Sequence, residues 1–291
     1  MPAEPKDFTQ LQAAQEAALL QASAGADLRT PPFPRDDQFY YTRSVTLSVQ
    51  NLDRLILKLA SADGPSTLTR ADLQGTARGF VLTEHRGWAS ATRTGRVLRA
   101  ELEIALLAPH AQDLWHANGR PSLTPPSMPQ AVAATGEHTH RVGNISLSRD
   151  QLFEFPSDPR LICERLRATR PDDPPKVLTQ LVDALRSGPK PAALRRGIFG
   201  ALLLQPNVRA VGSVRDGAGR EGLALRYIRE DQDSDHEQEL ILDGRSFELI
   251  GKRCRALDEL ARRFGVPAGA VIENTVVLER AVTDQIDAKA A

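Results

Sequence analysis

Hydrophobic and polar residues alternate with a period of two in the first third of the chain. Residues 39–49 place Val45, Leu47 and Val49 on one side of an extended chain and hydroxyl residues on the other. In residues 96–107, charged residues separate five apolar residues that point to the same side, namely Leu98, Ala100, Leu102, Ile104 and Leu106. This alternation is typical of antiparallel strands with one solvated face. We expect a third strand over residues 79–88 and a meander that connects all three.

A helical period replaces the alternation between residues 157 and 203. Ser157 or Asp158 can cap a first helix that has Pro159 in its first turn. Residues 177–185 carry apolar side chains at the i, i+4 and i+8 positions, and Gly188 follows where a helix terminator is expected. Pro191 starts a third predicted helix, whose apolar face contains Leu194, Ile198, Ala201 and Leu202.

Short alternating stretches return after Pro206 and are separated by turn signals such as Asp216-Gly217 and Asp243-Gly244. They predict four or five antiparallel strands that end near Val282. The order of strands, helices and strands predicts an α+β fold, in which helices pack on one face of a curved antiparallel sheet.

The predicted elements suggest one domain with an appended segment. Residues 1–37 combine a short amphipathic helix with a proline-rich tether, and residues 38–286 form the predicted single domain. Within it, residues 108–142 lack periodicity and contain five prolines, so we expect a mobile or functional loop with Trp115 as its one large anchor.

Composition narrows the class of protein. Hydrophobic residues make up 41% of 291 residues, enough for a substantial core, which excludes a wholly disordered chain. Lys plus Arg and Asp plus Glu number 37 each, and this balance disfavours a dedicated nucleic-acid binder. No apolar run is long enough to span a membrane. Cys163 and Cys254 are too few for a disulfide scaffold or a zinc site, and they could form one disulfide or remain buried free thiols.

Several ordered segments carry a resemblance to a known family. The sequence is similar to the extracytoplasmic domain of an uncharacterised actinobacterial membrane-anchored family, typically encoded beside extracytoplasmic-function sigma factors. The resemblance covers residues 38–285 and rests on the order of segments, none of them catalytic. They are Gln38-Phe-Tyr-Tyr-Thr-Arg-Ser44, Phe155-Pro-Ser-Asp-Pro159, Asn207-Val-Arg-Ala-Val-Gly212, Asp216-Gly-Ala-Gly219, Leu242-Asp-Gly-Arg-Ser-Phe-Glu-Leu249 and Gly269-Ala-Val271.

The resemblance implies a non-enzymatic sensory or regulatory domain that binds a protein partner or a signal outside the membrane. The family carries a transmembrane anchor that this chain lacks. Either Met1 begins an excised extracytoplasmic domain, which we favour, or the chain is a soluble relative that stays in the cytoplasm. The architecture is also similar to the lipoprotein-carrier and mycobacterial glycolipid-binding fold, in which helices cover a curved sheet and enclose an apolar cavity.

That analogy supplies an alternative function, a carrier or receptor for a lipid or another hydrophobic molecule. Its groove would lie between the sheet and the helices, although the helical side chains could equally fill the gap and leave a packed core. The candidate ligand-binding residues on this inner face are Leu98, Ala100, Leu102, Ile104, Leu106, Leu181, Leu185, Ile198 and Leu202. No cofactor, metal site or catalytic residue is predicted.

Two glycine and aspartate motifs favour hairpins over ligand sites. Residues 217–222 match G-x-G-x-x-G, but a strand follows where a dinucleotide site needs a helix. Asp231, Asp233 and Asp235 have the spacing of calcium ligands, but His236 stands where a calcium loop needs Gly and Leu242 where it needs Glu. We interpret the first motif as a tight turn and the second as a solvated acidic hairpin tip.

Two further motifs favour structural roles. Glu137, His138 and His140 could supply part of a metal site, but a third strong ligand is missing from the motif, and we favour a surface loop. Residues 257–267 resemble the first half of a helix-turn-helix, but β-branched residues follow and predict a last strand instead. No nucleophile motif or catalytic triad is recognisable, which disfavours a hydrolase.

Overall fold

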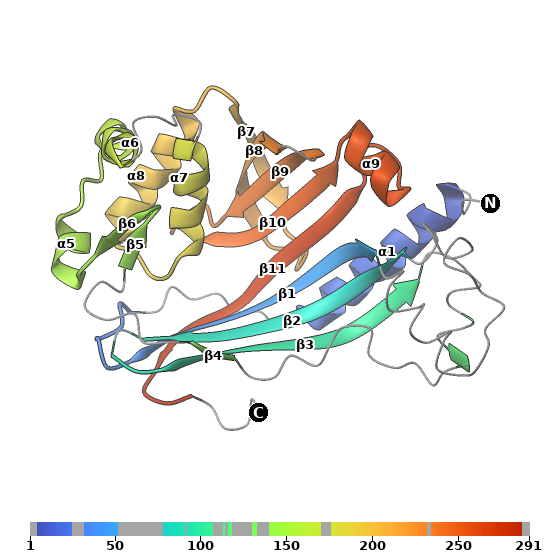
Figure 1. Ribbon diagram of the computed structural model, residues 1–291, viewed down its shortest axis with the longest axis horizontal. Coiled ribbons are helices and arrows are strands. Elements are labelled where there is room, and N and C mark those ends of the chain that lie inside the picture. The colour runs from blue at the N-terminus through green and yellow to red at the C-terminus, as the bar shows by residue number, and fades with distance from the viewer. Residues whose placement is uncertain are drawn as a thin grey trace.

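The computed structural model describes residues 5–24, 32–51, 78–90, 92–106, 113, 116–117, 130–132, 140–169, 176–231 and 234–286. Most of the predicted loop at 108–142, with Trp115, Glu137 and His138, lies outside these ranges. The described residues form an α+β fold built on a nine-stranded antiparallel sheet, as the sequence predicted (Figure 1).

The strand order in the sheet is β4-β3-β2-β1-β11-β10-β9-β8-β7. The first and last strands of the chain are therefore neighbours at its centre. The strands are β1 (Phe39–Asn51), β2 (Arg78–Ala89), β3 (Gly95–Leu106), β4 (Gln130–Val132), β7 (Val208–Arg215), β8 (Glu221–Asp231), β9 (Ser234–Leu242), β10 (Leu249–Ala256) and β11 (Val271–Thr283). A separate two-stranded sheet joins β5 (His140–Val142) to β6 (Ile145–Leu147).

The predicted meander of the first three strands is confirmed, with β1 paired to β2 and β2 to β3. The five C-terminal strands are also confirmed. The sequence did not predict the β5–β6 hairpin or the short helix α5 (Arg149–Glu154), which begins at a capping box formed by Ser148 and Gln151.

The helices begin and end where local sequence signals place them. In α6 (Pro159–Ala168), Asp158 is the N-cap residue and accepts hydrogen bonds from the amides of Arg160 and Leu161. Beyond the end of α7 (Lys176–Arg186), Gly188 adopts a φ of 62°, which glycine tolerates better than other residues. Pro191 precedes α8 (Ala192–Leu203), as expected.

The pairing register separates two cores on opposite faces of the sheet. Leu240 of β9 pairs with Leu225 of β8 and with Lys252 of β10, so these three side chains share one face. On this face Leu225 and Leu240 pack against α6, α7 and α8. Lys252 in turn pairs with Thr275 of β11, and Thr275 pairs with Thr46 of β1, so Thr46 lies on the same face. The next residue, Leu47, therefore points to the opposite face of the sheet.

On that second face Leu47 packs with Val45 and Leu82, and α1 (Pro5–Ala22) covers them. Leu19 of α1 is fully buried in this core. The helices α6 to α8 gather on one face, as expected, whereas α1, which the sequence assigned to a segment outside the domain, contributes to the core on the other. Figure 1 shows α1 running along β1 and β2, well away from α6 to α8.

A bulge in β3 breaks the alternation that the sequence suggested. Glu103 pairs with Leu82, and Glu101 pairs with the next residue, Thr83, so Leu102 is an extra residue without a partner. An extra residue reverses the faces of everything beyond it. Consequently Ile104 and Leu106 point to one face, and Leu98 and Ala100 point to the other.

Candidate functional site

A cleft of about 200 Å³ separates the end of α7 from the sheet. One wall is formed by the last turn of α7 and the segment that follows it, and the floor is formed by β1, β10 and β11, the central strands of the sheet. The residues that line the cleft are Tyr40, Thr42, Ser44, Leu185, Arg186, Gly188, Leu249, Gly251, Lys252, Thr275, Val277 and Arg280.

Three hydroxyl side chains of β1 face this cleft in a row. Tyr40, Thr42 and Ser44 occupy alternate positions of one strand, so they point to the same face of the sheet. Within the described residues none of the three hydroxyls has a hydrogen-bond partner, although each can both donate and accept. Burial raises the pKa of Tyr40 to about 12, so its hydroxyl stays protonated and remains a donor throughout the neutral range.

Cations line the cleft, and the carboxylates that pair with two of them are not among the residues that line it. Lys252 binds Glu273 at 2.9 Å. Arg280 binds Glu248 at 3.2 Å, and Arg195 binds the second oxygen of the same carboxylate at 3.1 Å. Two guanidinium groups therefore share one carboxylate, which leaves an excess of positive charge beside the cleft.

Arg186 stands at the rim, in the last turn of α7. Its side chain is exposed, and in the described part of the chain it forms no ion pair or side-chain hydrogen bond. A cation at this position is favoured by the negative end of the helix dipole. Arg186 is therefore placed to bind an anionic group that enters the cleft.

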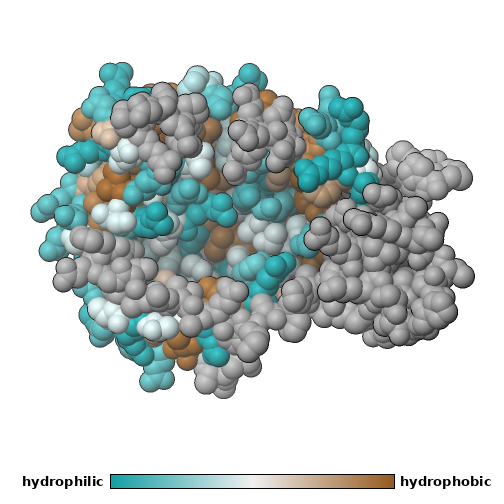
Figure 2. All heavy atoms as spheres, in the orientation of Figure 1, coloured by the Kyte–Doolittle hydropathy of each residue, from teal (hydrophilic) through white to brown (hydrophobic). Residues whose placement is uncertain are grey.

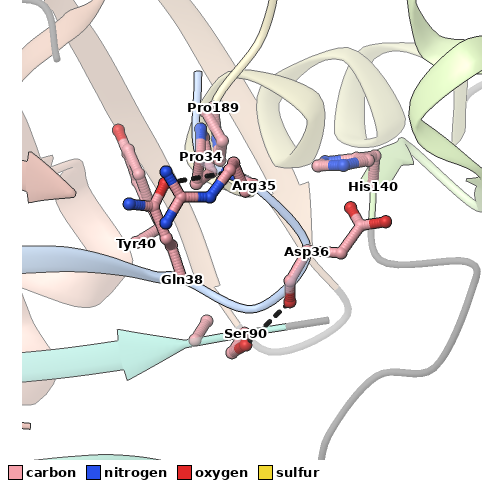
Figure 3. Close-up of a pocket in the computed structure, with 10 residues that line it drawn as sticks. Pro34, Arg35, Asp36, Gln38, Tyr40, Ser90, His140 and Pro189 are labelled. Atoms are coloured by element: carbon pink, nitrogen blue, oxygen red, sulfur yellow. Dashed lines mark hydrogen bonds between the residues drawn. The ribbon is translucent and has the colours of Figure 1, made fainter. Parts of the chain in front are cut away.

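A second cavity, of about 80 Å³, lies on the other side of Tyr40. The residues that line it are Pro34, Arg35, Asp36, Gln38, Tyr40, Ala89, Ser90, His140, Gly188 and Pro189 (Figure 3). Ser90 donates a hydrogen bond of 3.2 Å to the Asp36 carbonyl oxygen, which fastens the entry segment to β2. In Figure 3 the Asp36 carboxylate points towards the His140 ring. Burial and the charge of Lys190 lower the pKa of His140.

Lys190 is a buried lysine two residues after Gly188, which lines both cavities. Its ammonium group donates hydrogen bonds to the carbonyl oxygens of Ser187 and Gly188 just beyond the end of α7, and no carboxylate pairs with it in the described part of the chain. Burial lowers the pKa of Lys190 to about 7. Lys190 thus fixes the segment that forms one wall of the cleft.

The structure does not bring together the nine residues predicted to line a groove. Leu181, Ile198 and Leu202 are fully buried against β8 and β9 in the first core, and only Leu185 reaches the cleft. Ile104 and Leu106 are buried on β3, Leu98 is half-buried, and Ala100 and Leu102 are exposed. Four strands of the sheet separate β3 from β9, so these side chains cannot line one groove with α7 and α8.

The sequence reasoning overlooked the row Tyr40, Thr42 and Ser44. It recognised hydroxyl residues on one side of β1 but took that side to be solvated. A signal was available, since polar residues at successive alternate positions of a central strand need either solvent or a ligand cleft.

The structure bears out both hairpin interpretations. Residues 216–220 connect β7 to β8, with Gly219 at a φ of 79°, and no helix follows. Asp231 is the last residue of β8 and Asp235 lies on β9, so the acidic motif surrounds a hairpin connection; Asp233 is outside the described residues.

The remaining motifs fall on ordinary structural elements. His140 is on β5. The helix-turn-helix-like segment forms α9 (Asp258–Phe264) and then leads into β11, as expected. Cys163 and Cys254 are buried free thiols in separate cores, so they do not form a disulfide. Within the described ranges no three His, Cys, Asp or Glu side chains are close enough together to hold a metal ion.

Among the described helices, none combines the length and the apolar character needed to cross a bilayer. On the face seen in Figure 2, hydrophobic and hydrophilic residues of the described part are interspersed, and they do not form one broad apolar patch.

Comparison with known proteins identifies no family. No family model matches the chain, and no curated protein matches its sequence. Among solved structures, a crystal structure of MucB in complex with MucA(peri) matches with a TM-score of 0.27 and 12% identity. The match covers 95% of this chain and 60% of that chain, so this chain spans less than two thirds of MucB. A TM-score this low does not establish a common fold.

Proposed function

We propose that the chain is a non-enzymatic extracytoplasmic sensory or regulatory domain of a sigma-factor-linked membrane protein. Its signal, a small molecule or a segment of a partner protein, occupies the cleft between α7 and strands β1, β10 and β11. The proposal draws its biological setting from the resemblance of the ordered segments between Gln38 and Val271. The observation that carries the binding role is the row of three unpartnered hydroxyls at the floor of the cleft.

The chemistry of the cleft supports binding over catalysis. A nucleophile needs an adjacent general base, and here Ser44 has no hydrogen-bond partner in the described part of the chain. Lys252 and Arg280 are held in ion pairs, which fixes their positions. These features suit a preformed site that holds a ligand without transforming it.

A hydrophobic-molecule carrier remains the alternative, because Leu185, Leu249 and Val277 give the cleft an apolar side. Native and denatured masses of the chain purified from an actinobacterial host distinguish the two roles. A carrier retains a stoichiometric apolar passenger, whereas a regulatory domain without its signal has the mass of the polypeptide.

The regulatory role can be tested by filling the cleft. We expect Ser44→Trp, in the full-length membrane protein, to alter transcription from a promoter of the sigma factor encoded beside the gene. Ala100→Trp is the matched control, because Ala100 is exposed on β3, away from the cleft. Thermal unfolding of both variants separates a blocked cleft from a misfolded domain. If folded Ser44→Trp protein and a deletion of the whole gene both leave the reporter unchanged, the regulatory proposal is wrong.

A further inference from the structure

We propose that the ligand of the cleft carries an oxyanion, a phosphate or carboxylate group, and that Arg186 binds it together with the hydroxyls of Thr42 and Ser44. This inference rests on the proposed function for its biological meaning, but the binding chemistry can be measured independently. The oxyanion is either a free ion or the head group of an amphiphile, and the cleft offers contacts for both.

The charge of the lining residues supports this ligand class. Arg186, Lys252 and Arg280 are cations, and no residue that lines the cleft is acidic. The carboxylates of Glu273 and Glu248 bind the inner cations without themselves lining the cleft. An incoming anion therefore meets cations and donors, whereas an incoming cation meets no carboxylate.

The hydrogen-bonding capacity of the floor points the same way. Thr42 and Ser44 lie two residues apart on β1, and the half-buried hydroxyl of each is without a partner in the described part of the chain. A hydrogen bond from a hydroxyl to an ionised oxygen is stronger than a hydrogen bond between two neutral groups. Arg186 at the rim adds a planar guanidinium, which matches the geometry of phosphate and carboxylate groups.

The size of the cleft limits the ligand. A volume of about 200 Å³ is below the range of about 300–1,000 Å³ typical of sites for drug-sized molecules. It suits a small anion or a head group rather than a whole lipid. Leu185, Leu249 and Val277 lie beside the same cations and could contact the first carbons of an attached chain.

Calorimetric titration with defined probes tests the inference. Inorganic phosphate represents the free ion, hexyl phosphate represents a head group with a short chain, and hexanol is the uncharged control. We expect both phosphates to bind at concentrations up to about 10 mM and hexanol not to bind. Tighter binding of hexyl phosphate than of phosphate identifies an amphiphile, and equal binding identifies the free ion. Absence of binding by both phosphates overturns the inference.

Two variants locate the binding. Arg186→Gln should weaken phosphate binding by about tenfold or more, because a charge-assisted hydrogen bond is lost. Arg165→Gln is the matched control, because Arg165 is an exposed basic residue in the last turn of α6 and is absent from the lining of the cleft. Equal weakening by both substitutions would mean that phosphate binds to surface charge in general, and the inference fails.

The failure of this inference and the failure of the proposed function give different results. If Ser44→Trp alters the reporter while neither phosphate binds, the cleft is regulatory and its ligand belongs to another class. If phosphate binding depends on Arg186 while folded Ser44→Trp protein and the gene deletion both leave the reporter unchanged, the ligand class is right and the regulatory role is wrong.

Discussion

Arg220 binds Asp216, four residues before it, with its Nε atom 2.8 Å from a carboxylate oxygen. The same guanidinium donates to the carbonyl oxygens of Ile250 and Val277, at 3.2 and 2.8 Å. One ion pair therefore fastens the β7–β8 turn to β10 and β11. Because Val277 also lines the cleft, this contact holds part of its floor in place.

Removal of the Arg220 side chain should destabilise the fold. The carboxylate of Asp216 is fully shielded from solvent, so Arg220→Met leaves an uncompensated buried charge. Such losses cost about 3–5 kcal/mol. Urea denaturation measures the free energy of unfolding, and Arg209→Met, on the exposed part of β7, is the control with little expected effect. A loss below about 1 kcal/mol in Arg220→Met would mean that the turn is not held by this pair.

The packed core between the sheet and α6 to α8 predicts that two leucine truncations lower the free energy of unfolding by unequal amounts. Leu181→Ala removes a fully buried side chain and should cost about 2–5 kcal/mol, whereas Leu102→Ala removes a side chain that is 47% exposed and should cost well under 1 kcal/mol. Thermal or urea unfolding of both variants checks the difference. Similar costs would contradict the bulged register of β3.

Lys190 should make stability depend on pH in a defined window. Its folded pKa of about 7 lies below the value of about 10.4 for an unfolded lysine, so between these values the unfolded chain binds more protons. The free energy of unfolding of the wild type, relative to Lys190→Met, should therefore rise as the pH rises from about 7 to about 10. A relative stability that stays level or falls across this window would show that Lys190 is charged and solvated in the folded protein.

Glu239 should make the free energy of unfolding depend on pH in the acid range, where stability falls as the pH falls. Burial alone would raise its pKa, but hydrogen bonds and charges from Arg226 and Arg253 outweigh burial and hold the pKa below its ordinary value. The stabilisation is complete above the unfolded pKa of about 4.3 and is lost as the pH falls through the folded pKa. Acid titration of Glu239→Gln should show a shallower loss of stability than the wild type; matching acid profiles would mean that this pair does not stabilise the fold.

The sequence predicted those features that depend on neighbouring residues. Asp158 and Gly188 mark helix ends through their own hydrogen-bonding or conformational properties, so they could be recognised without the fold. Leu102 could not be recognised as a bulge, because apolar and polar residues alternate on both sides of it in the sequence. Only the pairing of β3 with β2 shows that Leu102 is an extra residue and that the side chains beyond it change faces. Likewise, the hydroxyl face of β1 follows the pattern of a solvated strand. Its position beneath α7 could not be recognised, because Ser44 and Leu185, which line the same cleft, are far apart in the chain.

One cysteine-labelling measurement in intact cells tests both the location of the domain and the role of the cleft. The native Cys163 and Cys254 are buried, so an introduced cysteine at Thr42 or at the exposed Ala100 is the accessible thiol among the described residues. Cells producing full-length Thr42→Cys or Ala100→Cys protein are treated with a membrane-impermeant maleimide, and the sigma-factor reporter is read afterwards. We expect both variants to be labelled and only labelled Thr42→Cys to change the reporter. Labelling in lysates but not in intact cells, or an unchanged reporter after Thr42→Cys is labelled, would contradict an extracytoplasmic regulatory domain that acts through this cleft.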